Sequence, residues 1–82
     1  MKEYKLSDKS YITLKKISFL NEIEKDIVLN DEKRTVSLND IDLLLDIIDD
    51  EIAVYGVTDD QERLIEYGYD LYALFDELYY SD

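Results

Sequence analysis

Residues 37–80 read SLNDIDLLLDIIDDEIAVYGVTDDQERLIEYGYDLYALFDELYY, and this stretch decides the predicted fold. It contains two patterns that are typical of helix starts. Ser37-Leu-Asn-Asp40 places a capping hydroxyl three residues before a carboxylate, and Thr58-Asp-Asp-Gln61 forms a capping box that ends in an amide. The two patterns predict an antiparallel pair of helices joined by a short turn, over residues 38–55 and 59–80.

Apolar residues in both segments recur at the spacing of a helix face. These residues are Ile41, Leu44, Leu45, Ile48, Ile52 and Tyr55 in the first segment, and Leu64, Leu71, Phe75 and Leu78 in the second. Gly56 can adopt the left-handed conformation that ends a helix, and Gly68 within the second stripe predicts close approach by a neighbouring helix. Leu43, Ile47 and Val54 form a separate strip that we expect to receive the N-terminal helix, with a dimer contact or a partner groove as the alternative.

The first 36 residues predict a third helix, over residues 8–26, which Ser7 would cap while Leu6 packs on Tyr11. Residues 27–38 hold two short β-prone runs around a polar turn. Because an isolated two-stranded hairpin is marginal, we expect a loop with some strand character and keep a minor β-hairpin as the alternative. The predicted fold class is therefore all-α, a small three-helix bundle that forms one acidic domain over residues 1–82.

Charge is distributed unevenly along the 82 residues, which carry 21 acidic and 9 basic side chains and a net charge of −12. Residues 1–36 have eight bases and seven acids, whereas residues 37–82 have fourteen acids and one base, Arg63. This balance argues against direct binding to nucleic acid or to an anionic membrane, because both repel the chain. With no long apolar stretch and no signal-peptide core, we expect a cytoplasmic protein.

Catalytic and metal-binding groups are scarce. The chain has no Cys and no His, and its two glycines do not make a phosphate-binding loop. The runs Asp49-Asp50-Glu51 and Asp59-Asp60 lack the alternating spacing of a calcium loop, so we interpret them as solvated helix surface. The sequence predicts no enzyme activity, no catalytic residue, no cofactor and no specific metal site.

Acidic side chains and tyrosines on the two predicted helices form the candidate site. Carboxylates at i,i+3 and i,i+4 spacing lie about 5–6 Å apart, roughly as phosphates follow one another along a DNA strand. We expect Tyr69 and Tyr80 to lie on the acidic surface, and Tyr72 and Tyr79 to pack against the N-terminal helix. The predicted partner-binding residues are Asp42, Asp46, Asp49, Asp50, Glu62, Glu66, Tyr69, Asp70, Asp76, Glu77 and Tyr80.

These features predict a small protein-binding inhibitor that imitates DNA and occupies the basic surface of a nucleic-acid-binding protein. In size, charge and lack of catalytic groups the chain resembles phage-encoded inhibitors of CRISPR nucleases, restriction enzymes and repair enzymes, although it shares no motif with them. One alternative is an antitoxin or immunity protein that neutralises a basic toxin. Another is a non-enzymatic regulatory adaptor of a mobile element. We expect a monomer or a homodimer.

Overall fold

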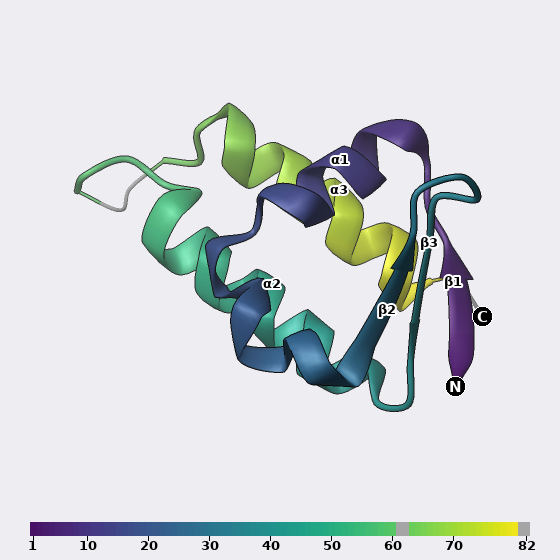
Figure 1. The fold of residues 1–82 in the computed structure, drawn as a ribbon. Helices are drawn as coiled ribbons and strands as arrows, with labels where there is room; N and C mark the ends of the chain where they lie inside the picture. Colours follow the sequence, from purple (N-terminus) through teal and green to yellow (C-terminus); the bar gives the residue numbers. More distant parts are fainter. Residues whose placement is uncertain (61–62, 81–82) are drawn as a thin grey trace.

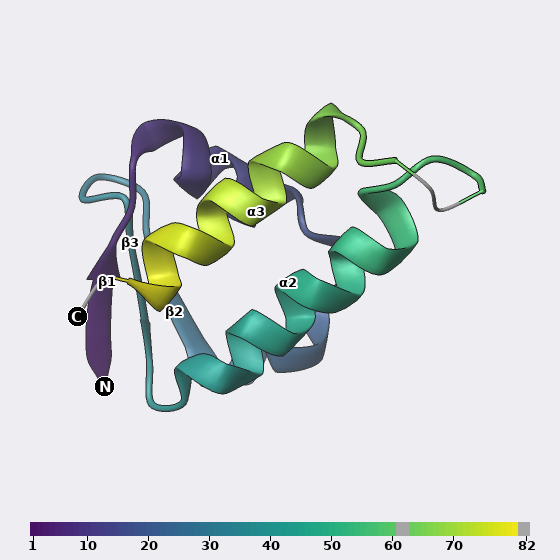
Figure 2. The ribbon, with the colours of Figure 1, turned by 180° about the vertical axis from the view of Figure 1, so that it is seen from behind.

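The computed structural model describes residues 1–60 and 63–80. Along the chain, one strand is followed by an α-helix and the 3₁₀ segment η1, then by two strands and two α-helices (Figure 1). Their bounds are β1 (Lys2–Lys5), α1 (Asp8–Lys16), η1 (Ser18–Asp26), β2 (Ile27–Asn30), β3 (Thr35–Leu38), α2 (Ile41–Tyr55) and α3 (Glu66–Tyr79). The sheet stands at one end of the molecule, and α2 and α3 run antiparallel beside each other (Figure 2).

The prediction of an all-α three-helix bundle is wrong, because the chain contains a three-stranded antiparallel sheet in the order β1-β3-β2. The strands align Tyr4 with Val36 and Val36 with Leu29, which places these three residues on one face of the sheet. The prediction weighed only a two-stranded hairpin. The strand that was not predicted is β1, Lys-Glu-Tyr-Lys. It carries a single apolar residue, so its sequence shows almost no alternation of polar and apolar residues.

The hydrophobic core lies between the sheet and the helices. Buried residues from every layer form one cluster, including Tyr4, Leu14, Val36, Leu44 and Leu71. Helix α1 packs against α3, and α2 packs against both α3 and η1. The core therefore joins the nearly neutral N-terminal part of the chain to the strongly acidic C-terminal part.

The predicted N-terminal helix over residues 8–26 is broken into α1 and η1, and η1 is itself interrupted at Ile23, which has φ −121° and ψ 17°. Ser7 caps α1 as predicted, because its hydroxyl accepts a hydrogen bond from the backbone N–H of Ser10 at 3.2 Å. The helix ends at Lys16, and Ile17 is extended with φ −64° and ψ 120°. The side chain of Ile17 is buried at this bend, so the chain changes direction to keep it in the core.

The two predicted helices of the C-terminal pair begin later than expected. Helix α2 begins at Ile41, where Asp40 accepts a hydrogen bond from the N–H of Asp42 at 3.0 Å. Ser37 does not cap it, because residues 37–38 complete the central strand β3. Sheet pairing has therefore overridden the local capping pattern.

The capping box at residues 58–61 does not begin a helix, and the connection between α2 and α3 is longer than the predicted short turn. The N–H of Thr58 donates to the carbonyl of Arg63 at 2.8 Å, and Val57 forms a β-bridge with Leu64. The hydroxyl of Thr58 bonds the carboxylate of Asp60, while Gln61 lies outside the described residues. Helix α3 begins only at Glu66.

Two glycines allow the end of α2 to touch the start of α3. A Cβ atom on Gly68 would lie 2.0 Å from the carbonyl oxygen of Gly56, so any side chain there would clash with backbone. The close approach predicted for Gly68 is confirmed. Gly56 has φ −95°, so the predicted left-handed conformation is wrong, and this residue is needed for its small size.

The second apolar strip of α2 is only partly covered. Ile47 is buried, and η1 packs on this helix, whereas Leu43 and Val54 remain exposed. The expectation that the N-terminal helix would cover this strip is therefore wrong for Leu43 and Val54.

Candidate functional site

A row of four aspartates covers the outer side of α2: Asp42, Asp46, Asp49 and Asp50 are all exposed. Their spacing of four, three and one residues places them opposite the buried stripe of Leu44, Ile48 and Ile52. Among the described residues, none of these four carboxylates forms an ion pair with a basic side chain. We call these four residues the aspartate row.

The pKa of Asp49 records the crowding within the aspartate row. Partial burial raises the pKa of its carboxyl above the ordinary value, and the negative charges of Asp46 and Asp50 raise it further. A carboxylate with cations nearby would show the opposite shift. The row therefore carries a local excess of negative charge that the protein itself does not neutralise.

The predicted acidic residues of α3 divide into two groups. Glu66 and Asp76 are exposed. Asp70 is instead half-buried and forms an ion pair with Lys9 of α1, with 3.2 Å between its Oδ1 and the lysine Nζ. Glu62, which was also predicted to bind a partner, lies outside the described residues. Only the first group is available to contact another molecule.

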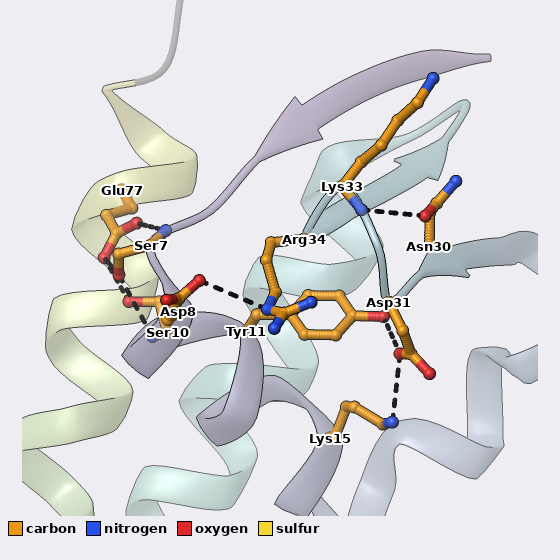
Figure 3. Close-up of polar contacts among 10 residues, drawn as sticks. All are labelled: Ser7, Asp8, Ser10, Tyr11, Lys15, Asn30, Asp31, Lys33, Arg34 and Glu77. Atoms are coloured by element: carbon orange, nitrogen blue, oxygen red, sulfur yellow. Dashed lines mark hydrogen bonds and ion pairs between the residues drawn. The ribbon is translucent and has the colours of Figure 1, made fainter.

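Glu77 connects α3 to the start of α1 (Figure 3). Its carboxylate accepts hydrogen bonds from the backbone N–H of Ser7 at 2.8 Å, from the Ser7 hydroxyl at 2.9 Å and from the Ser10 hydroxyl. Burial by itself raises the pKa of Glu77, but these hydrogen bonds outweigh it and the pKa is lower than the ordinary value. We therefore assign Glu77 to the stability of the fold and leave it out of the proposed partner-binding surface.

Three tyrosines of α3 and Tyr80, which caps its C-terminus, are exposed. Tyr69 and Tyr80 are 63% and 77% exposed, as expected for an interface. Tyr72 and Tyr79, which were predicted to pack on the N-terminal helix, are 46% and 59% exposed, so that prediction is wrong. Helix α1 contacts the other side of α3, where it meets Asp70 and Glu77, and it leaves the tyrosines uncovered.

Glu51 is a buried acid that the sequence reasoning placed on solvated surface. Its side chain is 1% exposed and accepts hydrogen bonds from the N–H groups of Ser18 and Phe19, at 2.9 and 3.3 Å, and from the Tyr67 hydroxyl at 2.9 Å. Burial, together with this contact, raises the pKa of Tyr67. The sequence does indicate this burial, because Glu51 follows Ile48 by three residues and so falls on the buried stripe of the helix.

The site contains no arrangement of groups that would hold a metal ion: over residues 1–60 and 63–80, no three carboxylates converge. Within the same ranges, no helix combines the length and the apolar character needed to cross a membrane. Comparisons of the chain with protein-family models, with curated proteins and with solved structures find no match. The candidate function therefore depends on the surface chemistry of α2 and α3.

Proposed function

We propose that this protein is a small acidic inhibitor that binds the basic nucleic-acid-binding surface of a target protein. The observation that carries the proposal is the aspartate row, whose four exposed carboxylates have no cationic partner among the described residues. Like charges at i,i+4 cost a few tenths of a kcal/mol per pair in a helix. A basic partner would relieve this repulsion, and the free energy recovered would contribute to binding.

The dimensions of the row suit a short segment of nucleic-acid backbone. Asp42 and Asp50 are separated by eight residues of a continuous helix, which corresponds to about 12 Å along its axis. DNA presents one charge per about 3.4 Å of axis on each strand, so the row would replace a few phosphates. Because the carboxylates are fixed on a rigid helix, little conformational entropy is lost on binding.

The exposed tyrosines add contact area beside the charges. Tyr69 and Tyr80 project from α3, and tyrosine is enriched in protein interfaces because it buries a large area at a small entropic cost. Binding without catalysis also fits a chain that has no His, no Cys and no phosphate-binding loop. A cytoplasmic location and the absence of direct nucleic-acid or membrane binding belong to the same proposal.

The experiment captures partners with the tagged chain and compares two matched variants for their affinity to the captured protein. One variant neutralises the aspartate row with D42N, D46N, D49N and D50N. The control neutralises four exposed acids of η1 and the β2–β3 turn with E22Q, E24Q, D26N and E32Q, so both variants change the net charge equally.

We expect the row variant to lose at least about tenfold in affinity for a basic nucleic-acid-binding protein, and the control to retain most of it. The affinity of the unchanged chain should also fall steeply with salt concentration. Equal losses in both variants would contradict the proposal, because bulk charge would then be the cause. Capture of a basic toxin, without any nucleic-acid-binding protein, would favour the antitoxin alternative.

A further inference from the structure

A hollow is lined by residues from the start of α2, the end of α3 and β1. Figure 2 shows these three segments at the same end of the molecule. The volume of the hollow is about 360 Å³, which lies near the lower end for pockets that accept small ligands. The residues that line it are Tyr4, Ile41, Asp42, Leu45, Leu78 and Tyr79. It thus has apolar walls, one exposed ring and a single carboxylate at its rim.

The ring of Tyr79 is held in place by its neighbours. Phe75 stacks with it at 5.9 Å between ring centroids, and Tyr80 meets it edge-on at 4.9 Å. Tyr79 is nevertheless 59% exposed, so part of its ring is open to solvent at the edge of the hollow. A fixed aromatic ring of this kind can bind a cation without losing side-chain freedom.

The electrostatic field around the hollow is negative. Helix α3 has no basic residue in its last turn, although cations are the residues that stabilise a helix C-terminus. Asp76 is exposed in that turn, and Asp42 lines the hollow from the start of α2. The ring of Tyr4, which also lines the hollow, lies 5.0 Å from the ammonium of Lys2, a distance typical of a cation–π contact.

We propose that this hollow accepts an arginine side chain of the partner, an inference that rests on the proposed function and specifies part of its interface. The aliphatic part of the arginine would lie against Leu45 and Leu78. Its guanidinium would stack on Tyr79 and bond the carboxylate of Asp42 through two parallel N–H groups. Lysine fits less well, because its compact and strongly hydrated ammonium neither stacks nor forms a bidentate pair.

The test is an NMR titration of the isotopically labelled full chain with two capped peptides, acetyl-Gly-Arg-Gly-amide and acetyl-Gly-Lys-Gly-amide. We expect the arginine peptide to shift the methyl resonances of Ile41, Leu45 and Leu78, and to bind about three- to tenfold more tightly than the lysine peptide. Y79L and D42N should each remove this preference. The matched controls Y72L and D26N change an exposed tyrosine and an exposed aspartate outside both the hollow and the proposed binding surface, and should keep it.

Equal binding of the two peptides, or shifts confined to Asp46 and Asp50, would overturn the inference. Amide spectra of each variant show whether it remains folded, and Y79F provides a second variant that keeps the ring and should retain the arginine preference. If Y79L and D42N bind a captured basic protein as tightly as the unchanged chain, the arginine site fails while the inhibitor function stands. If the arginine peptide occupies the hollow but no nucleic-acid-binding partner exists, the function fails and the site stands.

Discussion

The two parts of the chain use charge differently. In the N-terminal part, Lys15 pairs with Asp31 at 3.1 Å, and Arg34 pairs with Asp8 at 3.3 Å (Figure 3). These contacts attach the β2–β3 turn to α1. On α2, the aspartate row forms no comparable pair among the described residues. The difference indicates that these two ion pairs help to hold the turn against α1, whereas the charge of the aspartate row is directed outward.

Whether an acidic residue contacts the rest of the fold or faces outward depends on the face of the helix that carries it, and not on its position in the sequence. Asp70 and Glu77 belong to the acidic part, yet both lie on the side of α3 that meets α1 and contact Lys9, Ser7 and Ser10. Glu51 lies beside Asp50 in sequence but faces the core. Single substitutions can therefore separate structural acids from outward-facing ones.

The largest effect on stability is expected from Gly68→Ala. The added Cβ would lie 2.0 Å from the Gly56 carbonyl oxygen, so α2 and α3 would have to separate. We expect the free energy of unfolding to fall by about 3 kcal/mol, at the upper end of the range for overpacked sites. Urea denaturation measures this loss, with exposed Ala73→Ser as a helix control. A loss below about 0.5 kcal/mol, the range typical of surface changes, would contradict the close approach.

Replacing Glu51 is expected to have the next largest effect. Glu51→Ala leaves the N–H groups of Ser18 and Phe19 and the Tyr67 hydroxyl without their acceptor, which should cost about 2–3 kcal/mol. The neighbouring variant Asp50→Ala removes an exposed carboxylate that forms no ion pair within residues 1–60 and 63–80, and should change stability by less than about 0.5 kcal/mol. Thermal unfolding of the two variants compares an inward and an outward acid on one helix. If both variants lost a similar amount of stability, the distinction between the buried and the exposed acid would be contradicted.

Glu77→Gln should destabilise the protein by about 1 kcal/mol at neutral pH, because the hydrogen bonds from Ser7 and Ser10 lose a charged acceptor. The folded pKa of Glu77 is below its ordinary value, so this stabilisation is present above the unfolded pKa and disappears as pH falls through the folded pKa. Unfolding measured from pH 7 downward should show the two proteins converging in acid. A difference that stays constant with pH would contradict this role.

The smallest expected effect on stability comes from Asp49→Asn. This variant should raise the free energy of unfolding, whereas the variants above lower it. The folded pKa of Asp49 is raised, so its charged form destabilises the protein at neutral pH and protonation relieves this as pH falls. The variant should gain a few tenths of a kcal/mol at low ionic strength, and the gain should shrink with added salt. The unchanged protein should likewise melt at a higher temperature in moderate sodium chloride than in low salt. A melting temperature that falls with salt would contradict the charge distribution.

The sequence predicts those features that depend on local periodicity. The buried stripe of α2, the Ser7 cap and the outward placement of the aspartate row all follow from spacing along a helix. Features that depend on distant pairing were missed. Strand β1 has one apolar residue and pairs with β3, 30 to 36 residues away. The link from Glu77 to Ser7 spans 70 residues and leaves no local pattern that would indicate it.

The central claim, that the outward charge of α2 occupies a nucleic-acid site, is tested most directly by competition. Fluorescently labelled duplex DNA is bound to the captured basic partner, the unlabelled chain is added, and the anisotropy of the DNA is followed. If the two ligands share one surface, the chain releases the DNA completely, and saturating DNA prevents the chain from binding. A stable ternary complex of partner, DNA and chain would contradict the claim.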